Sequence, residues 1–90
     1  MKIRAIIKGL GEHVEGDLID ENGEPKLFLL DKSGKRIVLG IYKESIEFLV
    51  KDKWRNIVEG IELINAVFGE ASLPTGLLEY YKERVREGKT

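Results

Sequence analysis

The segment from Lys26 to Ile41, KLFLLDKSGKRIVLGI, constrains the fold more than any other part of the chain. It consists of two apolar runs around Ser33-Gly34 and therefore predicts a β-hairpin. A two-residue loop at Ser33-Gly34 pairs Leu29 with Val38 and sets the register of both strands. One face of this hairpin then carries Phe28, Leu30, Ile37, Leu39 and Ile41, and the other carries Leu27, Leu29 and Val38. Apolar residues on both faces predict that both faces of this part of the sheet are covered.

Two strands are expected before this hairpin. Residues 2–8 alternate apolar with charged side chains, which is the pattern of a strand with one buried face. Residues 13–20 form a weaker candidate, because Gly16 and the acids beside it are poor strand formers. Asn22-Gly23 follows and favours a type I′ turn. Pro25 then falls in a non-hydrogen-bonded pair, where its missing N–H costs little.

Residues 42–51 fit two patterns. As a strand, Ile46, Phe48 and Val50 alternate with charged residues; as a helix, Tyr42 and Ile46 begin an apolar stripe that continues along the chain. We favour the strand, because Asp52 can then act as the N-cap of the following helix.

Two amphipathic helices are predicted in the last part of the chain, over about 53–68 and 73–87. The first has a regular apolar side that includes Trp54, Ile57, Val58, Ile61, Ile64 and Phe68. A second, thinner line on it contains Gly60, Leu63 and Val67, and glycine in mid-helix suggests that another backbone approaches closely there. The alternating charges of residues 79–89 predict a solvated face on the second helix.

These elements predict an α+β fold in a single domain, residues 1–90. An antiparallel meander of four or five strands covers about 2–51, and the two helices pack on one face of it. Helices of this length cover one sheet face only, so a second apolar surface is left over. We expect a second copy of the chain to cover it, unless the sheet curls into a barrel and covers itself. This self-association surface is predicted to be either Leu27, Leu29 and Val38 of the hairpin or the helix line of Gly60, Leu63 and Val67.

Composition narrows the setting. The chain has no cysteine and a net charge of −1, which argues against a disulfide scaffold and against a general nucleic-acid footprint. The N-terminal apolar stretch is too short for a secretion signal, and no apolar run is long enough to span a membrane, so we expect a cytoplasmic protein without a membrane partner. Glu and Lys supply 22 residues while Gln is absent, a bias found in hyperthermophiles.

Three candidate sites compete with the self-association surface or add to it. His13, Glu15 and Asp17 share one strand face and could hold a divalent metal, but a single histidine is weak support for a metal site. Lys32, Lys35 and Arg36 at the hairpin tip could neutralise nucleic-acid phosphates. No nucleophile, base and orienting group occur together, so catalysis is disfavoured, and nothing indicates a cofactor.

The function expected from the sequence is therefore non-enzymatic. A small protein-interaction or oligomerisation module comes first, with a homodimer or another protein as partner. A nucleic-acid-binding accessory domain is the alternative, and a small-ligand or metal-binding domain around His13 is the third hypothesis.

Overall fold

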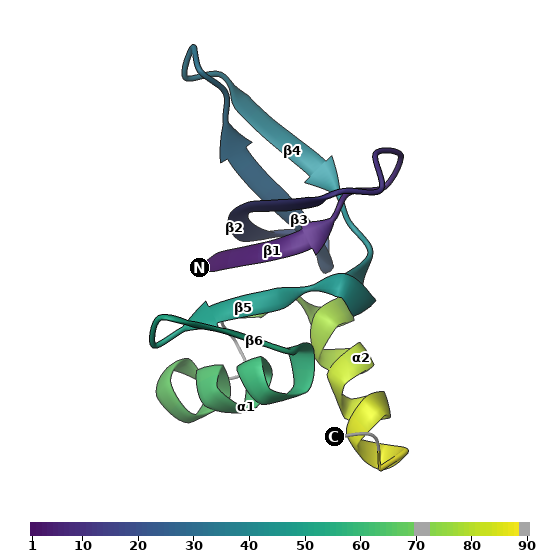
Figure 1. Cartoon of the computed structure of the whole chain (residues 1–90). Coiled ribbons are helices and arrows are strands. Elements are labelled where there is room, and N and C mark those ends of the chain that lie inside the picture. Colours follow the sequence, from purple (N-terminus) through teal and green to yellow (C-terminus); the bar gives the residue numbers. More distant parts are fainter. Residues whose placement is uncertain (70–72, 89–90) are drawn as a thin grey trace.

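The computed structural model describes residues 1–69 and 73–88 and confirms the α+β fold (Figure 1). Six strands form one antiparallel sheet, one strand more than the four or five predicted. The strands are β1 (Lys2–Ile6), β2 (His13–Glu21), β3 (Glu24–Leu30), β4 (Arg36–Gly40), β5 (Glu47–Val50) and β6 (Lys53–Arg55). A short 3₁₀ helix, η1 (Lys43–Ser45), separates β4 from β5, and the helices α1 (Ile57–Phe68) and α2 (Thr75–Arg86) follow.

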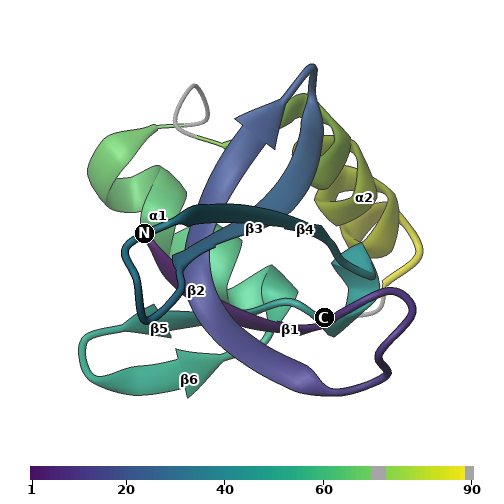
Figure 2. The same cartoon turned by 90° about the horizontal axis from the view of Figure 1, so that it is seen from above.

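The sheet curls into a partly closed barrel. Its strand order is β4-β3-β2-β1-β5-β6, and Ile7, just after β1, also forms an antiparallel bridge with Ile41, just after β4. Around this bridge the Lys8 N–H donates to the Gly40 carbonyl oxygen at 3.0 Å, and the Tyr42 N–H donates to the carbonyl oxygen of residue 6 at 3.1 Å. Figure 2 shows the first four strands curving around a common interior. The inner face of the sheet is therefore covered in part by the sheet itself.

The curl depends on a bend in β2 at Gly16. The first part of β2 pairs with β1 and the last part pairs with β3, so the strand changes partner along its length. A Cβ atom on Gly16 would lie 2.7 Å from Leu27 Cδ2 and 2.7 Å from the Phe28 carbonyl oxygen. Glycine is a poor strand former, but at this corner it lets two backbones approach closely. The strand pattern of residues 13–20 is weak because this bend requires a glycine, which is a poor strand former.

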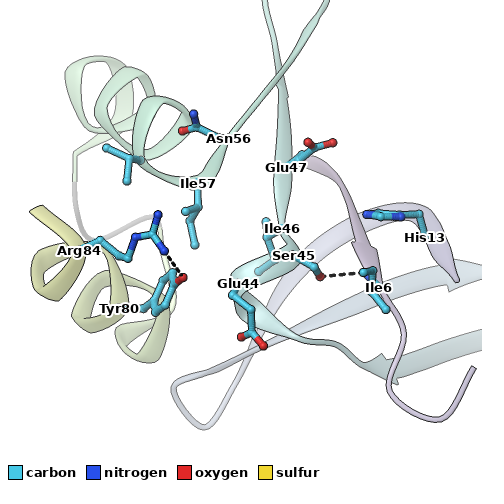
Figure 3. A pocket seen from close by; sticks show the side chains of 11 residues that line it. Ile6, His13, Glu44, Ser45, Ile46, Glu47, Asn56, Ile57, Tyr80 and Arg84 are labelled. Atoms are coloured by element: carbon cyan, nitrogen blue, oxygen red, sulfur yellow. Dashed lines mark hydrogen bonds between the residues drawn. The ribbon is translucent and has the colours of Figure 1, made fainter. Parts of the chain in front are cut away.

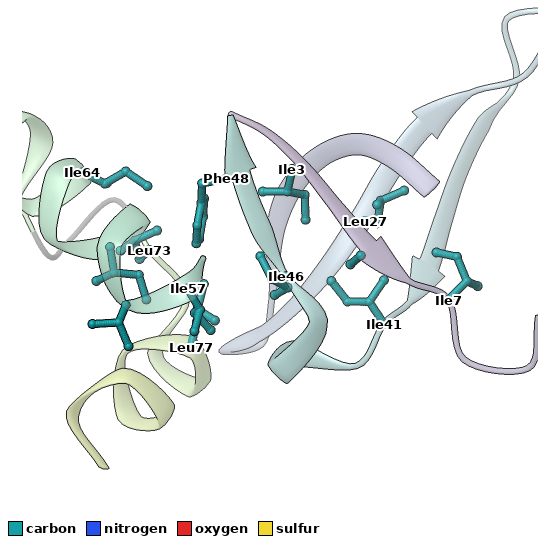
Figure 4. Packing of buried hydrophobic residues seen from close by; sticks show 13 residues of the cluster. Ile3, Ile7, Leu27, Ile41, Ile46, Phe48, Ile57, Ile64, Leu73 and Leu77 are labelled. Carbon is teal, nitrogen blue, oxygen red and sulfur yellow. The ribbon is translucent and has the colours of Figure 1, made fainter. Parts of the chain in front are cut away.

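The core lies between the inner face of the sheet and the two helices (Figure 4). Phe48 of β5 is fully buried and separates the sheet from α1. Gly60 of α1 lies directly on it, because a Cβ there would be 2.6 Å from Phe48 Cδ2. The close neighbour of Gly60 is thus an aromatic side chain of the same chain, not another backbone. The remaining buried apolar residues are Ile3, Ala5, Ile7, Leu27, Ile41, Ile46, Ile57, Val58, Ile61, Ile64, Leu73 and Leu77.

Helix α2 is attached to the β2–β3 hairpin. The Gly76 N–H donates to the carbonyl oxygen of Gly23, in the β2–β3 turn, at 2.8 Å. The next residue, Leu77, is fully buried. Both helices therefore contribute to the core on the inner side of the sheet, as the sequence predicts.

The β2–β3 hairpin confirms its sequence signal. Asn22 and Gly23 have φ of +54° and +87°, as a type I′ turn requires. Pro25 lies opposite Asp20, in the second pair from the turn. Asp20 also stabilises the turn, because its Oδ1 accepts a hydrogen bond from the Gly23 N–H at 2.7 Å.

The predicted register of the β3–β4 hairpin is wrong by one residue. The loop consists of Lys32-Ser33-Gly34, and the Asp31 N–H donates to the Lys35 carbonyl oxygen at 3.0 Å. Gly34 has φ of +86°, the left-handed conformation that a three-residue hairpin loop needs. The Asp31 Oδ1 organises the loop: it accepts hydrogen bonds from the N–H groups of Ser33 and Lys35, both at 2.8 Å, and from the Ser33 hydroxyl at 2.7 Å.

This register exchanges the faces of β4 relative to β3. Phe28 lies opposite Val38, where the prediction paired Leu29 with Val38. A slip of one residue moves every side chain of one strand to the other face. The inner face of the hairpin thus carries Leu27, Leu29, Ile37 and Leu39, and the outer face carries Phe28, Leu30 and Val38. Both faces are apolar, as predicted, but the helices and the curled sheet cover the inner one.

The strand interpretation of residues 42–51 is confirmed for Glu47–Val50. The predicted N-cap at Asp52 is wrong: Lys51 and Asp52 have φ of +52° and +62° and form the turn between β5 and β6. Asn56 caps the helix instead. Trp54 therefore belongs to β6 and not to the apolar stripe of the helix, which begins four residues later than predicted, at Ile57. Within the described residues, no helix is long and apolar enough to cross a membrane.

Candidate functional site

The outer face of β2, β3 and β4 carries an apolar patch, the outer patch, which consists of Ile19, Phe28, Leu30 and Val38. Leu30 is 58% exposed and Val38 is 46% exposed, while Ile19 and Phe28 are half-buried. Neither helix covers this face, because both pack against the inner side (Figure 1). The outer patch is therefore an apolar surface that neither helix covers, and of the residues predicted for such a surface it contains only Val38.

An open hollow of about 340 Å³ lies over the outer patch. Its lining residues are Ile19, Phe28, Val38 and Arg36. The Arg36 guanidinium lies 5.5 Å from the centroid of the Phe28 ring, a cation–π geometry that draws the long side chain over the apolar surface. The patch thus has a cation at one rim and open space above its centre.

The two ends of β3 carry opposite charges. The β2–β3 turn contains three acids and no Lys or Arg between positions 20 and 25; the acids are Asp20, Glu21 and Glu24. The β3–β4 loop and the residues beside it include three cations, Lys32, Lys35 and Arg36, and a single acid, Asp31. The seven residues of β3 separate these ends by about 20 Å, at about 3.3 Å per residue.

Each of the two alternative sets predicted for self-association contains a single exposed residue. Leu27 is fully buried and Leu29 packs against the core, because the hairpin register differs from the prediction. Gly60 is buried against Phe48 and Leu63 is half-buried. The two exposed members lie on different elements, Val38 on β4 and Val67 on α1.

The structure brings the predicted nucleic-acid residues together at the hairpin tip. Lys32, Lys35 and Arg36 are all exposed. Arg36 is engaged with Phe28, so it extends along the outer face rather than away from the tip. The cations form the basic end of β3 described above and do not continue as a basic stripe over the sheet.

The predicted metal residues share the outer face of β2 but do not form a metal site. Glu15 lies opposite Arg4, and Asp17 lies 3.7 Å from the N-terminal amine. Arg4 itself is paired with Glu47, whereas the N-terminal amine lies close enough to Asp17 to form an ion pair. Across residues 1–69 and 73–88, no group of three or more His, Asp or Glu side chains is placed to hold a metal ion, and His13, the third predicted ligand, is exposed at the start of β2.

A second hollow, of about 360 Å³, lies between α2, the start of α1 and the segment that contains η1 and β5 (Figure 3). Tyr80 and Arg84 line it from α2, and Arg84 Nη1 donates a hydrogen bond to the Tyr80 hydroxyl oxygen at 3.2 Å. The other lining residues are Ile6, His13, Glu44, Ser45, Ile46, Glu47, Asn56, Ile57 and Val58. Apolar and polar side chains thus surround a space of the size that small ligands occupy.

Sequence reasoning missed both hollows for different reasons. The sequence pattern predicts a two-residue loop at Ser33-Gly34, and this loop length places Phe28 and Leu30 on the covered face. Asp31 three positions before Gly34 was the available signal for the longer loop, since an Asp side chain caps its own turn. Arg84 was assigned to a solvated helix face, and no local pattern shows that α2 turns it toward the start of α1.

Comparisons with protein-family models, with curated proteins and with solved structures found no match to this chain. The features from which a function can be inferred are therefore the two hollows and the charges around them.

Proposed function

We propose that this chain is a non-enzymatic, cytoplasmic self-association module that forms a homodimer through the outer patch. The observation that carries the proposal is the exposed apolar face of β3 and β4 between two oppositely charged ends.

The exposed apolar side chains of the outer patch support an interface. Leu30 and Val38 project from neighbouring strands beside the half-buried Phe28, so the exposed carbon atoms are contiguous rather than scattered. Single exposed apolar residues are ordinary on protein surfaces, whereas contiguous patches mark interaction sites. A partner that covers Leu30 and Val38 would remove them from water at a gain of roughly 25 cal/mol per Å² of apolar surface.

The charged ends favour a second copy of the chain as the partner. In a two-fold dimer the same surface of each protomer faces the other, so residue pairs occur twice. If the β3 strands of the two protomers run in opposite directions, the basic end of one lies over the acidic end of its partner, and the reverse holds at the other end. This arrangement matches Lys35 and its neighbours with Glu21 and its neighbours, and such complementarity sets orientation as well as encounter rate.

The test is sedimentation velocity of the full chain between about 1 and 200 μM. We expect a concentration-dependent monomer–dimer equilibrium, and we expect Val38→Glu to weaken it at least about tenfold, because a carboxylate would be buried at the interface. Val67→Glu is the matched control: it places the same charge at an exposed valine of α1, outside the outer patch, and should leave the equilibrium unchanged.

Charge variants test the orientation. Lys35→Glu should weaken the dimer, and the double variant Lys35→Glu/Glu21→Lys should restore it, because each pair is again of opposite sign. A single-chain mass at 200 μM, or equal effects of Val38→Glu and Val67→Glu, would overturn the proposal. Retention of such a monomer on heparin that rising salt abolishes would instead favour the nucleic-acid alternative through Lys32, Lys35 and Arg36.

A further inference from the structure

Strand β4 lies at one edge of the sheet and has backbone groups that point away from its neighbour β3. The Gly40 carbonyl oxygen points away from β3, because it accepts the hydrogen bond from the Lys8 N–H. Residues two apart on a strand direct their backbone groups to the same side, so the N–H and C=O groups of Arg36 and Val38 also point away from β3. Within the part of the chain that the structure describes, β4 pairs with no other strand, and neither residue forms a backbone hydrogen bond outside that pairing. These groups are therefore open to a further strand.

This edge lacks the features that usually protect an edge strand. Natural edge strands are protected by shortness, a proline, a bulge or a charge on the buried face. The other edge of the sheet, β6, has three residues, and two of them are Lys53 and Arg55. β4 has five residues without a proline, and its inner face carries Ile37 and Leu39. The hairpin that contains β4 also projects away from both helices (Figure 1).

Apolar side chains flank the open edge on both faces of the sheet. Val38 is exposed on the outer face, and Ile37 is half-buried on the inner face. An added strand alternates its side chains between the two faces, so it can place apolar residues beside both. In this kind of recognition the backbone hydrogen bonds give affinity and the alternating side chains give specificity.

The charges along the edge favour an acidic partner. Residues 32–43, which include all of β4, contain four Lys and Arg residues and no Asp or Glu. Arg36 lies at one end of β4. At the other end, a Cβ atom on Gly40 would lie 3.8 Å from Lys8 Cδ and 4.0 Å from Lys26 Nζ. Cations therefore border the edge at both ends. A second copy of β4 would bring the same cations with it, whereas a segment with carboxylates complements them.

From this arrangement we infer that β4 binds an extended, acidic segment of another protein as an added antiparallel strand. The backbone of the segment forms hydrogen bonds with the N–H and C=O groups of Arg36 and Val38. Acids at its first and fifth positions meet Arg36 at one end of β4 and Lys26 at the other, and the three residues between them are apolar, as are the middle residues of β4. The site does not depend on the proposed dimer, because its hydrogen bonds come from the backbone at the edge and not from the side chains of the outer patch.

The test is an NMR titration of the full ¹⁵N-labelled chain with the peptide acetyl-Glu-Val-Val-Val-Glu-amide. The peptide should give saturable shifts of the Arg36 and Val38 amide signals and should slow hydrogen exchange of both N–H groups. The amide signals of β6, at the opposite edge, should not shift. The peptide acetyl-Lys-Val-Val-Val-Lys-amide is the charge control and should bind at least about tenfold more weakly. Equal binding of the two peptides, or equal shifts at both edges, would overturn the inference.

Two N-methylated forms of the acidic peptide test the backbone hydrogen bonds. In the antiparallel arrangement the central valine lies opposite Val38 and directs its N–H to β4, whereas the valine before it directs its N–H away. N-methylation of the central valine should therefore weaken binding at least about tenfold, and N-methylation of the valine before it should not. Equal effects of the two methyl groups, or the reverse order, would contradict the antiparallel pairing.

Two variants of the chain test the same bond from the other side. Val38→Pro removes the N–H at the edge but keeps the hydrogen bonds to β3, because Val38 and Phe28 form a pair without backbone hydrogen bonds to each other. It should abolish peptide binding. Val38→Ala is the matched control, since it loses the side chain but keeps the N–H, and it should still bind. Equal binding by a folded Val38→Pro and by Val38→Ala would overturn the inference. So would a loss of self-association in Val38→Pro that Val38→Ala does not share, because it would assign the edge to a second copy.

Discussion

At Gly60, one additional carbon atom would disturb the packing of the core. Helix propensity alone favours alanine there by about 1 kcal/mol. The Cβ of an alanine would, however, lie 2.6 Å from Phe48 Cδ2 and 3.0 Å from Phe48 Cβ. Phe48 Cβ is attached directly to the backbone of β5, so a rotation of the ring does not relieve that contact. The packing cost therefore outweighs the gain in propensity.

Gly60→Ala is accordingly expected to lower the free energy of unfolding by up to about 2 kcal/mol, since overpacking of a core costs roughly 1–3 kcal/mol and the gain in helix propensity offsets about 1 kcal/mol of it. Urea unfolding followed by circular dichroism measures the change. Ala66→Gly is the calibration in the same helix: the site is exposed, so its loss of about 1 kcal/mol reports propensity alone. A Gly60→Ala protein more stable than the wild type would contradict the packing argument.

Asp31 makes the β3–β4 loop sensitive to pH. The hydrogen bond from the Ser33 hydroxyl, followed by that from the Lys35 N–H, lowers the pKa of Asp31 below its ordinary value of 3.8. A carboxyl group with a depressed folded-state pKa stabilises the native state above its unfolded pKa and loses that contribution as the pH falls through the folded value.

Asp31→Ala should therefore be less stable than the wild type at pH 7, and the difference should shrink as the pH falls below about 4. Urea midpoints of both proteins between pH 7 and pH 2 give the comparison. Asp31→Asn is the control, because it keeps an acceptor oxygen but does not titrate, so its stability relative to Asp31→Ala should be nearly independent of pH. A wild-type advantage over Asp31→Ala that persists undiminished at pH 2 would count against this assignment.

Among the elements, a hairpin turn is predicted correctly where its sequence is typical of one turn type. It is predicted incorrectly where the sequence is compatible with two loop lengths. Asn22-Gly23 permits one common hairpin turn, and the structure contains it. Ser33-Gly34 is compatible with a loop of two or three residues, and the Asp31 carboxylate selects the longer one. Because of this difference of one residue, Val38 lies opposite Phe28 and not opposite Leu29. Val38 and Leu29 therefore lie on opposite faces of the hairpin, whereas the prediction placed them on the same face.

The start of α1 shows the same limitation. Asp52 and Asn56 are both good cap residues, and sequence alone favoured the first. The turn at Lys51-Asp52 requires positive φ at a lysine, which no common turn signature announces. Residues 53–55, which the prediction placed in the first turn of the helix, therefore belong to β6.

Asn56→Ala is expected to lower the free energy of unfolding by about 1 kcal/mol, because the Glu59 N–H loses its side-chain acceptor at 2.8 Å. Asn56→Ser should restore most of this loss, since serine is an equally good cap. Thermal unfolding monitored at 222 nm distinguishes the three proteins. Equal stability of the alanine and serine variants would show that the capping bond contributes nothing.

For the molecule as a whole, the fold class and the two apolar faces were predictable, whereas the closure of the sheet was not. Closure depends on the bridge between Ile7 and Ile41 and on the bend at Gly16, and both bring together segments far apart in the sequence. The hollow around Arg84 has the same origin, since η1, α1 and α2 all contribute to it. The periodicity of apolar residues indicates which side of a segment is buried. It does not indicate which distant segment packs against that side.

The composition predicts high thermal stability. A chain with 22 Glu and Lys residues and no Gln has the bias of hyperthermophile proteins, so unfolding should begin well above about 50 °C, where many mesophilic domains are already melting. Calorimetry at a few micromolar and at ten times that concentration separates the stability of the single chain from that added by association. An onset near 50 °C at both concentrations would remove the thermophile hypothesis.

The hydrogen bond from Gly76 to Gly23 has a consequence for how the chain is made. Residue 23 leaves the ribosome before residue 76, so the β2–β3 hairpin is synthesised before the helix that packs on its turn. A chain cut short before Thr75 would therefore leave the β2–β3 turn without this contact.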